Sequence, residues 1–376
     1  MKFITNLDKA INIISFDVPY PPNYGGVIDV FYKIKALKKL EFDIYLHTFE
    51  YGKGESNELE KYCKKIYYYK RKSTLLSLFS IVPSIVLSRK NKRLIINLKK
   101  NNYPILFEGL HTTYPLIKTF FNKRIIMVRA HNIEHHYYNG LLKSESNIFK
   151  KLFYFFEAIK LKKHQEVLEK TYFILTISPL EQDYFSIRFP LKSKYIPAFH
   201  QNNTINSNNG IGKFALYHGD LRVPDNIKAC TFLIKIFSKI NYPLVIASSF
   251  NNQHISNKVK KYTNISFKNN CNKSELDNLV KDAHINVLPT FQNTGIKLKL
   301  INALYNGKFC LVNNFMVKDT GLEKLCVIAN SEEQFTEQIK SLSQQKFTDQ
   351  EILKRKELLA NYNTEMSALK IVELLN

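Results

Sequence analysis

Short apolar segments recur along the whole chain, separated by stretches with helical periodicity, and this alternation constrains the fold more than any other feature of the sequence. The first segment is INIISF at 11–16 and the last is FCLV at 309–312. Short bounded runs of this kind are typical of buried strands, and strands that alternate with helices pair in parallel. The sequence therefore predicts an α/β fold built on parallel sheets. The other predicted strands are 43–49, 104–109, 124–130, 172–178, 214–219, 243–249, 264–267 and 284–289.

The length of the chain and one polar tract predict two domains. A chain of 376 residues exceeds the size of a typical single core. The tract 201–212, QNNTINSNNGIG, is rich in Asn and is typical of a linker. After this tract the alternation of strands and helices starts again. We therefore expect an N-terminal Rossmann-like domain over 1–200 and a C-terminal one over 213–358, with a cleft between them.

The charge of the chain predicts an anionic partner. The net charge is +23, and residues 1–200 hold 33 Lys and Arg against 17 Asp and Glu. Such a basic surface binds nucleic acid, an acidic membrane or a phosphorylated substrate, and charge alone does not choose among them. The five cysteines form no CxxC pair, which predicts reduced thiols and a cytoplasmic protein. The N-terminus has no cleavable signal pattern, and no apolar run approaches the ~20 residues of a membrane span.

Residues 64–103 are the most distinctive stretch of the basic half. Basic clusters flank an apolar core at 75–87, which is too short to span a bilayer. This pattern predicts contact with an anionic membrane, at the inner face of the cell membrane. We expect Lys90, Arg93 and Lys99 to face that membrane. The alternative is a pair of core-facing helices with solvated basic ends.

Three residues of the first half follow predicted strands, at the sheet edge where α/β proteins bind ligands. Gly25 and Gly26 come between the first strand and the first helix, where glycines let the backbone approach a ligand or simply make a turn. His131 follows strand 124–130, where an imidazole can bond a sugar hydroxyl or move a proton. The alternative role of His131 is that of a structural loop residue.

The segment 131–135, HNIEH, also matches the H-x-x-E-H signature of zinc proteases. That site requires two histidines and a glutamate on one helix face, together with a third ligand. Because this segment follows directly on a strand, we disfavour the zinc-protease interpretation.

In the second half a loop, a helix and a strand follow one another over 289–313. Turn-forming residues precede Gly295, where the helix is expected to begin, and a helix N-terminus attracts phosphate. Lys299, one turn further in, can add an ammonium to the same phosphate. Asn302 can bond a ribose hydroxyl. The alternative is an ordinary amphipathic helix after an ordinary loop.

Five motifs are spread over nearly the whole chain. They are P-x-P-x-x-x-G-G (Pro19 to Gly26), R-x-H-N-x-E (Arg129 to Glu134), L-T-I-S (Leu175 to Ser178), Y-H-G-D-L-R-V-P-D-N (Tyr217 to Asn226) and T-G-I-K-L-K-L-I-N-A-L-x-x-G (Thr294 to Gly307). With this set, in this order, the chain resembles the GT-B-fold glycosyltransferases. The resemblance is to the large retaining group, family 4-like, of bacterial mannosyl- and glucosyltransferases of polysaccharide and glycolipid synthesis.

The resemblance implies two tandem Rossmann-like domains with an interdomain cleft, and a helix at 359–376 that packs back on the first domain. It implies an enzyme that transfers a sugar from a nucleotide-sugar donor to a hydroxyl of a glycan or lipid-linked acceptor. Catalytic roles are implied for His131 and Glu134. Donor contacts are implied for Gly25, Gly26, Gly219, Arg222, Thr294, Gly295, Lys299 and Asn302, and acceptor contacts for Asp17, Tyr24 and Arg129.

The chain departs from the family where two glutamates often stand eight positions apart. Here those positions are Thr294 and Asn302, while Gly295 and Lys299 match a G-x-x-x-K pattern of some branches. The donor sugar, its nucleotide and retention of configuration therefore stay open. No D-x-D pair occurs, so the resemblance implies a reaction that needs neither a metal nor another cofactor.

Two alternatives to glycosyl transfer remain. One is another nucleotide-sugar reaction on the same fold, such as epimerisation. The other is a basic, non-catalytic protein that binds a membrane or nucleic acid. The second is disfavoured, and no nucleic-acid partner is expected, because the basic runs lack the motif spacings of RNA- and DNA-binding proteins.

Overall fold

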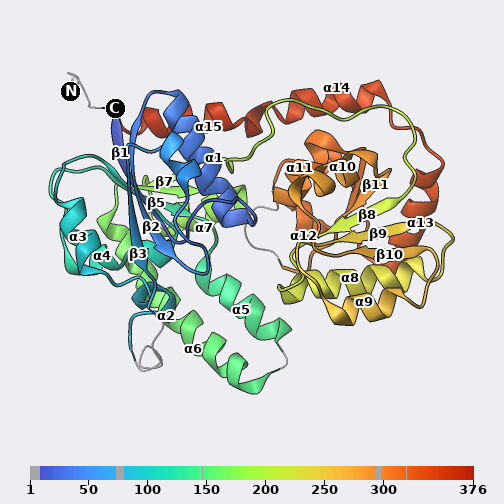
Figure 1. Cartoon of the computed structure of the whole chain (residues 1–376), viewed down its shortest axis with the longest axis horizontal. Helices are drawn as coiled ribbons and strands as arrows, with labels where there is room; N and C mark the ends of the chain where they lie inside the picture. The colour runs from blue at the N-terminus through green and yellow to red at the C-terminus, as the bar shows by residue number, and fades with distance from the viewer. Residues whose placement is uncertain (1–8, 73–79, 146, 293–297, 319) are drawn as a thin grey trace. The chain divides into compact units, whose positions relative to one another are not determined.

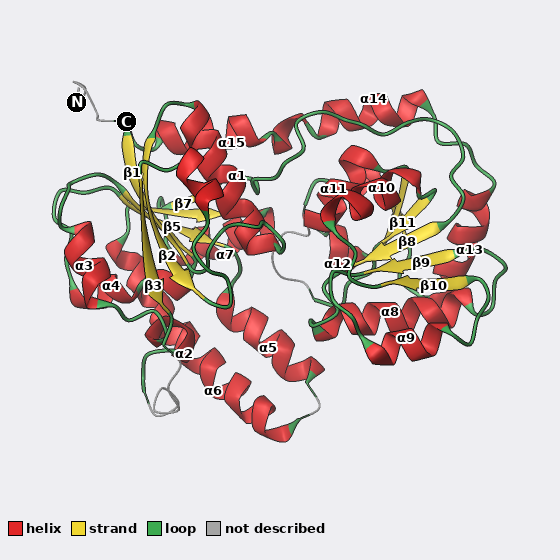
Figure 2. Ribbon diagram, in the orientation of Figure 1, coloured by secondary structure: helices red, strands yellow, loops and turns green. Residues whose placement is uncertain are grey.

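The computed structural model of the protein describes residues 9–72, 80–145, 147–292, 298–318 and 320–376. It divides into two compact units (Figure 1). The first holds the described chain up to Gln201 together with Tyr362–Asn376, and the second holds the described chain between Asn202 and Asn361. In each unit, helices cover both faces of a parallel sheet (Figure 2). Within the described ranges, no helix has the length and hydropathy needed to cross a membrane.

The first unit is built on a seven-stranded sheet in the order β3-β2-β1-β4-β5-β6-β7, with every neighbouring pair parallel. Sheets of this order bind ligands beyond the carboxyl ends of the strands where the order reverses, here between β1 and β4. The strands are β1 (Ala10–Ser15), β2 (Asp43–Glu50), β3 (Lys65–Lys70), β4 (Ile105–Glu108), β5 (Ile126–Ala130), β6 (Phe173–Thr176) and β7 (Ser193–Tyr195). The helices are α1 (Gly25–Lys39), η1 (Asn57–Lys61), α2 (Ser84–Leu87), α3 (Lys92–Leu98), η3 (Leu110–Thr112), α4 (Tyr114–Lys118), α5 (Glu134–Ser144), α6 (Ile148–His164), η4 (Gln165–Lys170), α7 (Pro179–Arg188) and α15 (Thr364–Glu373).

The second unit repeats this topology with six parallel strands in the order β10-β9-β8-β11-β12-β13. Its order reverses between β8 and β11. The strands are β8 (Ala215–His218), β9 (Leu244–Ala247), β10 (Ile265–Lys268), β11 (Ile285–Val287), β12 (Phe309–Val312) and β13 (Val327–Ile328). The helices are α8 (Pro224–Phe237), α9 (Gln253–Val259), α10 (Lys273–Asp282), α11 (Leu298–Asn306), α12 (Asn314–Val317), η5 (Glu323–Leu325), α13 (Glu332–Ser343), α14 (Asp349–Leu358) and η6 (Ala360–Tyr362).

The strands are apolar because both faces of each sheet are covered. In β1, Ile11 and Ile13 pack into the cluster under α1, and Ile14 packs into the cluster on the opposite face. This double burial is the physical reason for the continuous apolar runs in the sequence. The prediction of two tandem α/β domains with parallel sheets is confirmed.

The last helix, α15, belongs to the first unit, as the resemblance implied. Its buried face, with Ala368 and Ile371, joins the core cluster that α1 also enters. Lys39 of α1 forms an ion pair with Glu365 at 3.0 Å. Upstream of the helix, His200 Nε2 lies 2.7 Å from the carbonyl oxygen of Tyr362.

The Asn-rich tract interpreted as a linker is hydrogen-bonded along the second unit. The Asn206 N–H donates to the Tyr305 carbonyl at 2.7 Å, and Gly210 forms a two-way bridge with Phe347. Arg355 donates to Ser207 Oγ at 2.8 Å. The polar groups of this tract therefore find their hydrogen-bond partners in distant parts of the chain.

The stretch 64–103 folds differently from the membrane-facing segment that we expected. Its first part, KIYYYK, is β3, the edge strand of the first sheet. The helix within the predicted apolar core, α2, has only 4 residues. A strand flanked by lysines is typical of a sheet edge, where charge prevents pairing with another chain. Part of the predicted core, residues 75–79, lies outside the described residues.

Candidate functional site

The reversal point of the first sheet gathers aromatic and imidazole side chains beyond the strand ends. The ring of Phe16, just after β1, meets the ring of His131 edge-on, with centroids 5.5 Å apart. It also lies 5.6 Å from the ring of His111. A Cβ on Gly26 would stand 2.5 Å from Phe16 Cζ. A residue with a side chain at position 26 would therefore clash with the Phe16 ring.

A network of buried charged groups lies directly behind His131. Its Nε2 is 2.9 Å from Glu108 Oε2, and the other oxygen of Glu108 is 2.7 Å from Lys33 Nζ. Lys33 also pairs with Asp29 at 2.9 Å, and Asp29 pairs with Arg129 at 2.9 Å. All these side chains are fully buried except His131, which is 9% exposed.

The network keeps its carboxylates ionised. Burial by itself raises the pKa of Glu108, but Lys33 and the hydrogen bond from His131 outweigh it and lower that pKa below its ordinary value. Burial likewise opposes ionisation of Asp29, yet Arg129 and Lys33 hold its pKa well below the usual range. With two carboxylates, one ammonium and one guanidinium, the network is neutral when the His131 ring is neutral.

The ionised Glu108 fixes the orientation of His131. A carboxylate is only an acceptor, so the hydrogen between the two groups is carried by His131 Nε2. In the neutral ring, Nδ1 then carries the lone pair, and no described residue hydrogen-bonds it. His131 can therefore accept a hydrogen bond, or a proton, from a ligand hydroxyl.

Arg129 corrects one expectation of the sequence. Its side chain is fully buried and donates to Asp29 and to the carbonyl oxygens of Thr176, Ile196 and Pro197. No surface remains from which it could contact an acceptor. The arginine of the R-x-H-N-x-E motif instead ties β5 to the segment that follows β7.

The H-x-x-E-H interpretation is wrong for this structure. Helix α5 begins at Glu134, so His131 precedes the helix and does not share a face with His135. A different set, Asp29, Glu108 and His131, brings its ligand atoms within 4.8 Å of one another, as a metal site does. The ammonium of Lys33 already lies between the two carboxylates of that set. A divalent cation would have to displace it.

Glu134, the first residue of α5, is the second candidate catalytic group. It is 3% exposed, and burial raises its pKa to about 8. Its Oε2 lies 3.9 Å from His111 Nε2, and its Oε1 has no hydrogen-bond partner among the described residues. Burial lowers the pKa of His111 well below its ordinary value, so this ring is neutral. At neutral pH Glu134 is therefore largely protonated and can donate to a ligand.

Asp17 and Tyr24 stabilise the turn between β1 and α1. The Tyr24 hydroxyl donates to one oxygen of Asp17 at 2.7 Å, and the Val18 N–H donates to the other at 2.8 Å. Asp17 is 4% exposed, so little of it is open to an acceptor. Tyr24 is half-buried, and Gly25 is exposed at the start of α1.

In the second unit, Lys299 reaches the end of β8. Its Nζ lies 3.2 Å from Asn226 Oδ1 and 5.0 Å from the centroid of the Tyr217 ring. A Cβ on Gly219 would lie 3.0 Å from Asn226 Cγ, so Gly219 packs closely on the same asparagine. Gly219 and Lys299, which are 80 positions apart in the chain, therefore both lie against Asn226 beyond the end of β8.

His218, the last residue of β8, is buried beside Lys299. Burial, and then the charge of Lys299, lower its pKa to about 3. Its Nε2 has no hydrogen-bond partner among the described residues. A neutral imidazole with an unsatisfied nitrogen at a strand end is available to a ligand. Apart from its place in the Tyr217 to Asn226 motif, this residue could not be identified from the sequence.

Arg222, another predicted donor contact, is hydrogen-bonded within the protein. The guanidinium of Arg222 donates to both oxygens of Asp220 and stacks 3.6 Å from the centroid of the Phe250 ring. A phosphate at Arg222 must therefore compete with Asp220.

Asn302 lies in a group of asparagines. Its Oδ1 accepts from Asn306 at 2.9 Å and from Asn202 at 3.3 Å. The side chain thus joins α11 to the preceding linker, and a ribose contact would require it to exchange these partners. Thr294 and Gly295 lie outside the described residues.

Asp29, Lys33 and Glu108, which lie in the charged network behind His131, were not predicted from the sequence. Asp29 and Lys33 stand four apart on α1, a spacing that also occurs on solvated helix surfaces, so it does not reveal burial. Glu108 closes the apolar strand ILFE and precedes Gly109, whose φ is +71°. A carboxylate at the end of a buried strand is the one signal that could have identified it.

The residues expected to face a membrane lie on or beside a helix, α3, that packs on the core. Lys90, Arg93 and Lys99 are exposed, while Leu94 and Leu98 of α3 face the core. Among the described residues of α3, Ile96 is the exposed large apolar side chain. This is the pattern of a core-facing helix with solvated basic ends.

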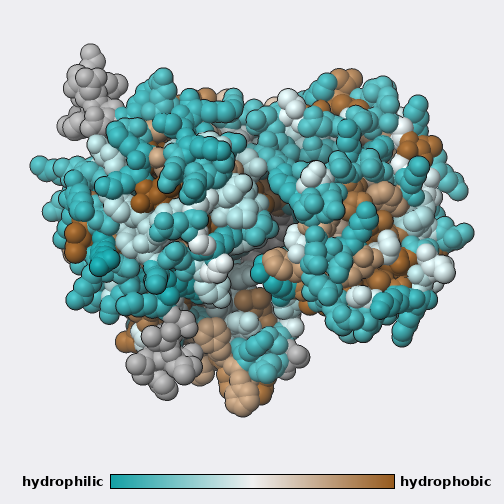
Figure 3. All heavy atoms as spheres, viewed as in Figure 1, coloured by the Kyte–Doolittle hydropathy of each residue, from teal (hydrophilic) through white to brown (hydrophobic). Residues whose placement is uncertain are grey.

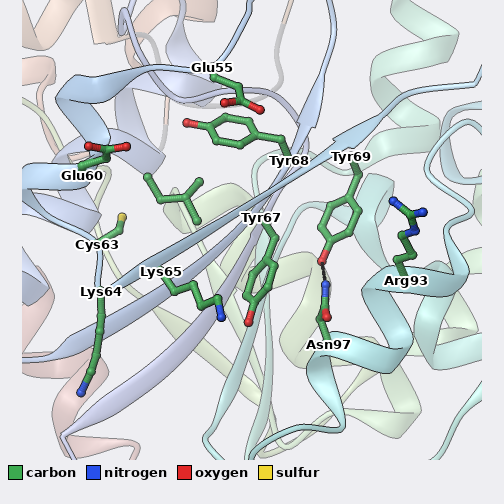
Figure 4. Close-up of a pocket in the computed structure, with 11 residues that line it drawn as sticks. Glu55, Glu60, Cys63, Lys64, Lys65, Tyr67, Tyr68, Tyr69, Arg93 and Asn97 are labelled. Carbon is green, nitrogen blue, oxygen red and sulfur yellow. Dashed lines mark hydrogen bonds between the residues drawn. The ribbon is translucent and has the colours of Figure 1, made fainter.

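A pocket of about 680 Å³ lies against the edge strand β3. Figure 4 shows Tyr67, Tyr68 and Tyr69 of β3 beside Arg93 and Asn97 of α3, with the Tyr69 hydroxyl bonded to Asn97. Of the predicted site residues, only Arg93 lines it. The pocket lies at the edge of the first sheet, away from the candidate residues at the reversal point.

Comparison with known proteins supports this architecture. No protein-family model matches the chain. One curated relative, described as an uncharacterized 44.6 kDa protein in the cps region of Klebsiella pneumoniae, is 29% identical over 357 residues, which cover 88% of this chain and 89% of the relative.

Several solved glycosyltransferases have the same fold over almost the whole chain. A variant of S. aureus TarM, in complex with fondaparinux, alpha-GlcNAc-glycerol and UDP, has a TM-score of 0.67 at 12% identity, covering 98% of this chain and 100% of that one. Anabaena HepE in complex with UDP-glucose has a TM-score of 0.63 at 11% identity, covering 97% and 99%. The lipopolysaccharide outer core galactosyltransferase WaaB has a TM-score of 0.61 at 12% identity, covering 96% and 98%. The chain therefore has the two-domain GT-B fold, the fold of these solved glycosyltransferases.

Proposed function

We propose that the protein is a glycosyltransferase that moves a sugar from a nucleotide-sugar donor to a hydroxyl of a glycan or lipid-linked acceptor. The acceptor belongs to surface polysaccharide, glycolipid or glycoprotein glycan synthesis. The observation that carries the proposal is the Glu108–His131 pair, which holds an imidazole acceptor at the reversal point of the first sheet. The fold likeness to TarM and HepE, whose structures contain UDP or UDP-glucose, supports a nucleotide-sugar donor.

In this proposal the second unit binds the donor nucleotide. Lys299 supplies an ammonium at the end of β8, where Gly219 lets the backbone come close to a ligand. A positive charge placed there stabilises the diphosphate as it leaves with the electrons of the glycosidic bond. Arg222 contributes a second cation if the diphosphate displaces Asp220.

The first unit supplies the groups that act on the sugar. His131 accepts a hydrogen bond from a sugar hydroxyl through Nδ1, and its orientation is set before the ligand arrives. Protonated Glu134 donates a hydrogen bond near the same strand ends. We infer a reaction without a metal, because Lys33 already neutralises Asp29 and Glu108, the carboxylates that are grouped as in a metal site among the described residues. Retention of configuration is part of the proposal through the family resemblance.

The proposal is tested by binding first and turnover second. A ligand at 100 times its dissociation constant stabilises a protein by ~2.7 kcal/mol, so a thermal-shift screen of UDP-, GDP- and dTDP-sugars identifies the donor. Turnover of that donor is then followed with and without acceptor extracts, in buffer containing EDTA. We expect transfer that needs an acceptor and survives EDTA.

Other outcomes separate the alternatives. Conversion of the donor to an isomer without any acceptor supports the epimerase alternative. No shift with any nucleotide sugar, together with tight, salt-dependent binding to nucleic acid, supports a non-catalytic basic protein.

A further inference from the structure

Helix α6 carries a continuous exposed apolar surface on its outer face. Ile148, Leu152, Phe155 and Ile159 recur at spacings of four and three residues, so they lie on one side of the helix. Phe149 and Phe156 widen the same face. These six side chains, here called the α6 patch, are between 47% and 79% exposed. In Figure 3, brown and tan side chains gather over α6.

The opposite face of α6 is already packed. Ala158 and Leu161 form a buried cluster with Tyr138 of α5, and α5 and α6 lie side by side as a helical hairpin (Figure 1). Glu157 is buried and accepts from the Ser84 N–H at 2.7 Å and from Lys160 at 2.9 Å. The helix is therefore apolar on both sides, and the α6 patch does not serve the fold of the hairpin.

The lysines around the α6 patch favour an anionic partner. Lys151, Lys162 and Lys163 form no ion pair with any described residue, and the only acid of the helix is the buried Glu157. A second copy of the chain would bring like charges together across such a face. An anionic lipid surface offers acidic headgroups to the lysines and hydrocarbon to the apolar side chains at the same time.

We propose that the α6 patch is the surface by which this protein docks on an anionic membrane. The hairpin is attached directly to the candidate site, because α5 begins at Glu134, three residues after His131. A helix of 11 residues is about 16 Å long. Docking through α6 therefore places the membrane within reach of the first-unit site, which specifies a lipid-linked acceptor. That last step rests on the proposed glycosyltransferase function, whereas the docking itself does not.

The test is cosedimentation of the full chain with vesicles of phosphatidylcholine, alone or mixed with phosphatidylglycerol. We expect wild-type protein to bind the mixed vesicles and to bind the neutral ones at least tenfold more weakly. The double variant Phe149→Ser with Phe156→Ser should lose at least tenfold in binding to mixed vesicles. Ile187→Ser is the matched control, because Ile187 on α7 is 83% exposed and lies off the patch. That variant should bind as wild type.

Charge-reversal variants test whether the lysines beside the α6 patch contribute to vesicle binding. Lys162→Glu with Lys163→Glu should weaken binding to mixed vesicles at least tenfold, while Lys260→Glu with Lys261→Glu, the same change on exposed residues of the second unit, should leave it unchanged. Equal affinity for neutral and mixed vesicles, or wild-type binding by the Phe149/Phe156 variant, overturns the proposal. So does loss of binding on reversing Lys90, Arg93 and Lys99 alone.

Sedimentation velocity of wild type and the Phe149/Phe156 variant tests whether a second copy of the chain binds the α6 patch instead. A dimer that only the wild type forms assigns the patch to a second copy and also overturns the proposal. The thermal shift with nucleotide sugars is measured on the same preparations without vesicles. A protein that binds the donor but not the membrane refutes the docking inference alone, and a protein that docks without binding any donor refutes the proposed function alone.

Discussion

Glu108 Oε2 lies 2.9 Å from Nε2 of His131; Glu108 ends strand β4, and His131 directly follows the adjacent parallel strand β5. The carboxylate is ionised because Lys33 stands 2.7 Å from its other oxygen. An imidazole that would otherwise rotate is thus held with one defined nitrogen toward the ligand side. In the proposed function, Glu108 is therefore a positioning residue and His131 is the group that touches the sugar.

We first predict that Glu108→Gln lowers kcat by about 10- to 100-fold, by analogy with the loss of a residue that orients a ligating histidine, with little change in the KM for the donor. The amide can present its NH₂ group to His131 and reverse the orientation of the ring nitrogens. Steady-state kinetics measure the effect. In the His131→Ala background, Glu108→Gln should have no further effect on kcat.

The same substitution leaves Lys33 partly unpaired, so its stability needs a control. Lys33→Met combined with Glu108→Gln restores the charge balance and should regain melting temperature without regaining kcat. Recovery of activity in this double variant would show that Glu108 acts only through stability.

A second prediction concerns Lys299. Lys299→Ala should abolish transfer and remove the thermal shift that the donor produces, while the melting temperature of the ligand-free protein stays nearly unchanged. The reason is that the ammonium lies at the end of β8, 3.2 Å from Asn226 Oδ1 and 3.5 Å from the Tyr217 hydroxyl, where it would stabilise the charge of the donor diphosphate. Lys235→Ala, which removes an exposed ion pair with Glu332, is the control. A large fall in the ligand-free melting temperature would assign Lys299 a structural role.

The third prediction follows from the titration of Glu134. Burial raises its pKa from 4.5 to about 8, so the folded protein resists an ionisation that the unfolded chain allows. Stability from this group is fully present below pH 4.5 and is lost as the pH rises toward 8, by at most ~5 kcal/mol. Glu134→Gln does not titrate. Its melting temperature relative to wild type should therefore rise steadily between pH 5 and pH 8.5, and a difference independent of pH would contradict the assignment.

The fourth prediction is that Gly26→Ala destabilises the first unit by about 1–3 kcal/mol, although alanine favours helices. The new Cβ would stand 2.5 Å from Phe16 Cζ, and the displaced ring also contacts His131. Urea denaturation measures the loss. Gly54→Ala, whose Cβ would meet no atom within 4 Å, should change stability by less than ~0.5 kcal/mol. Combining Gly26→Ala with Phe16→Leu should restore part of the loss.

The fifth prediction tests the structural role of Arg129. Arg129→Met leaves Asp29 with one cation fewer and removes one hydrogen-bond donor from each of three carbonyl oxygens, which should cost about 3–5 kcal/mol in urea denaturation. Arg188→Met removes an ion pair with Glu166 at the surface and should cost less than ~1 kcal/mol. An Arg129 variant of normal stability with a raised KM for the acceptor would restore the acceptor-side assignment.

The sequence determined the architecture because the apolar runs and the helical periodicity are local signals. Segments such as INIISF and FCLV become strands wherever both faces of a sheet are covered, and two successive series of them require two sheets. The same local patterns placed Gly26 and His131 after strand ends. They failed at KIYYYK, because a short edge strand with lysines at its ends has the same composition as a solvated basic segment.

The tertiary structure decided which of these residues act together. In the sequence, Lys33 and Arg129 cannot be told from ordinary helix and strand residues. Only the tertiary structure shows that both are buried against Asp29. Asn302 stands three residues from Lys299 in the chain, yet its amide is bonded to Asn202 and Asn306. Hydrogen bonds and ion pairs of this kind join residues far apart in sequence, so their partners are fixed by the fold and not by local pattern.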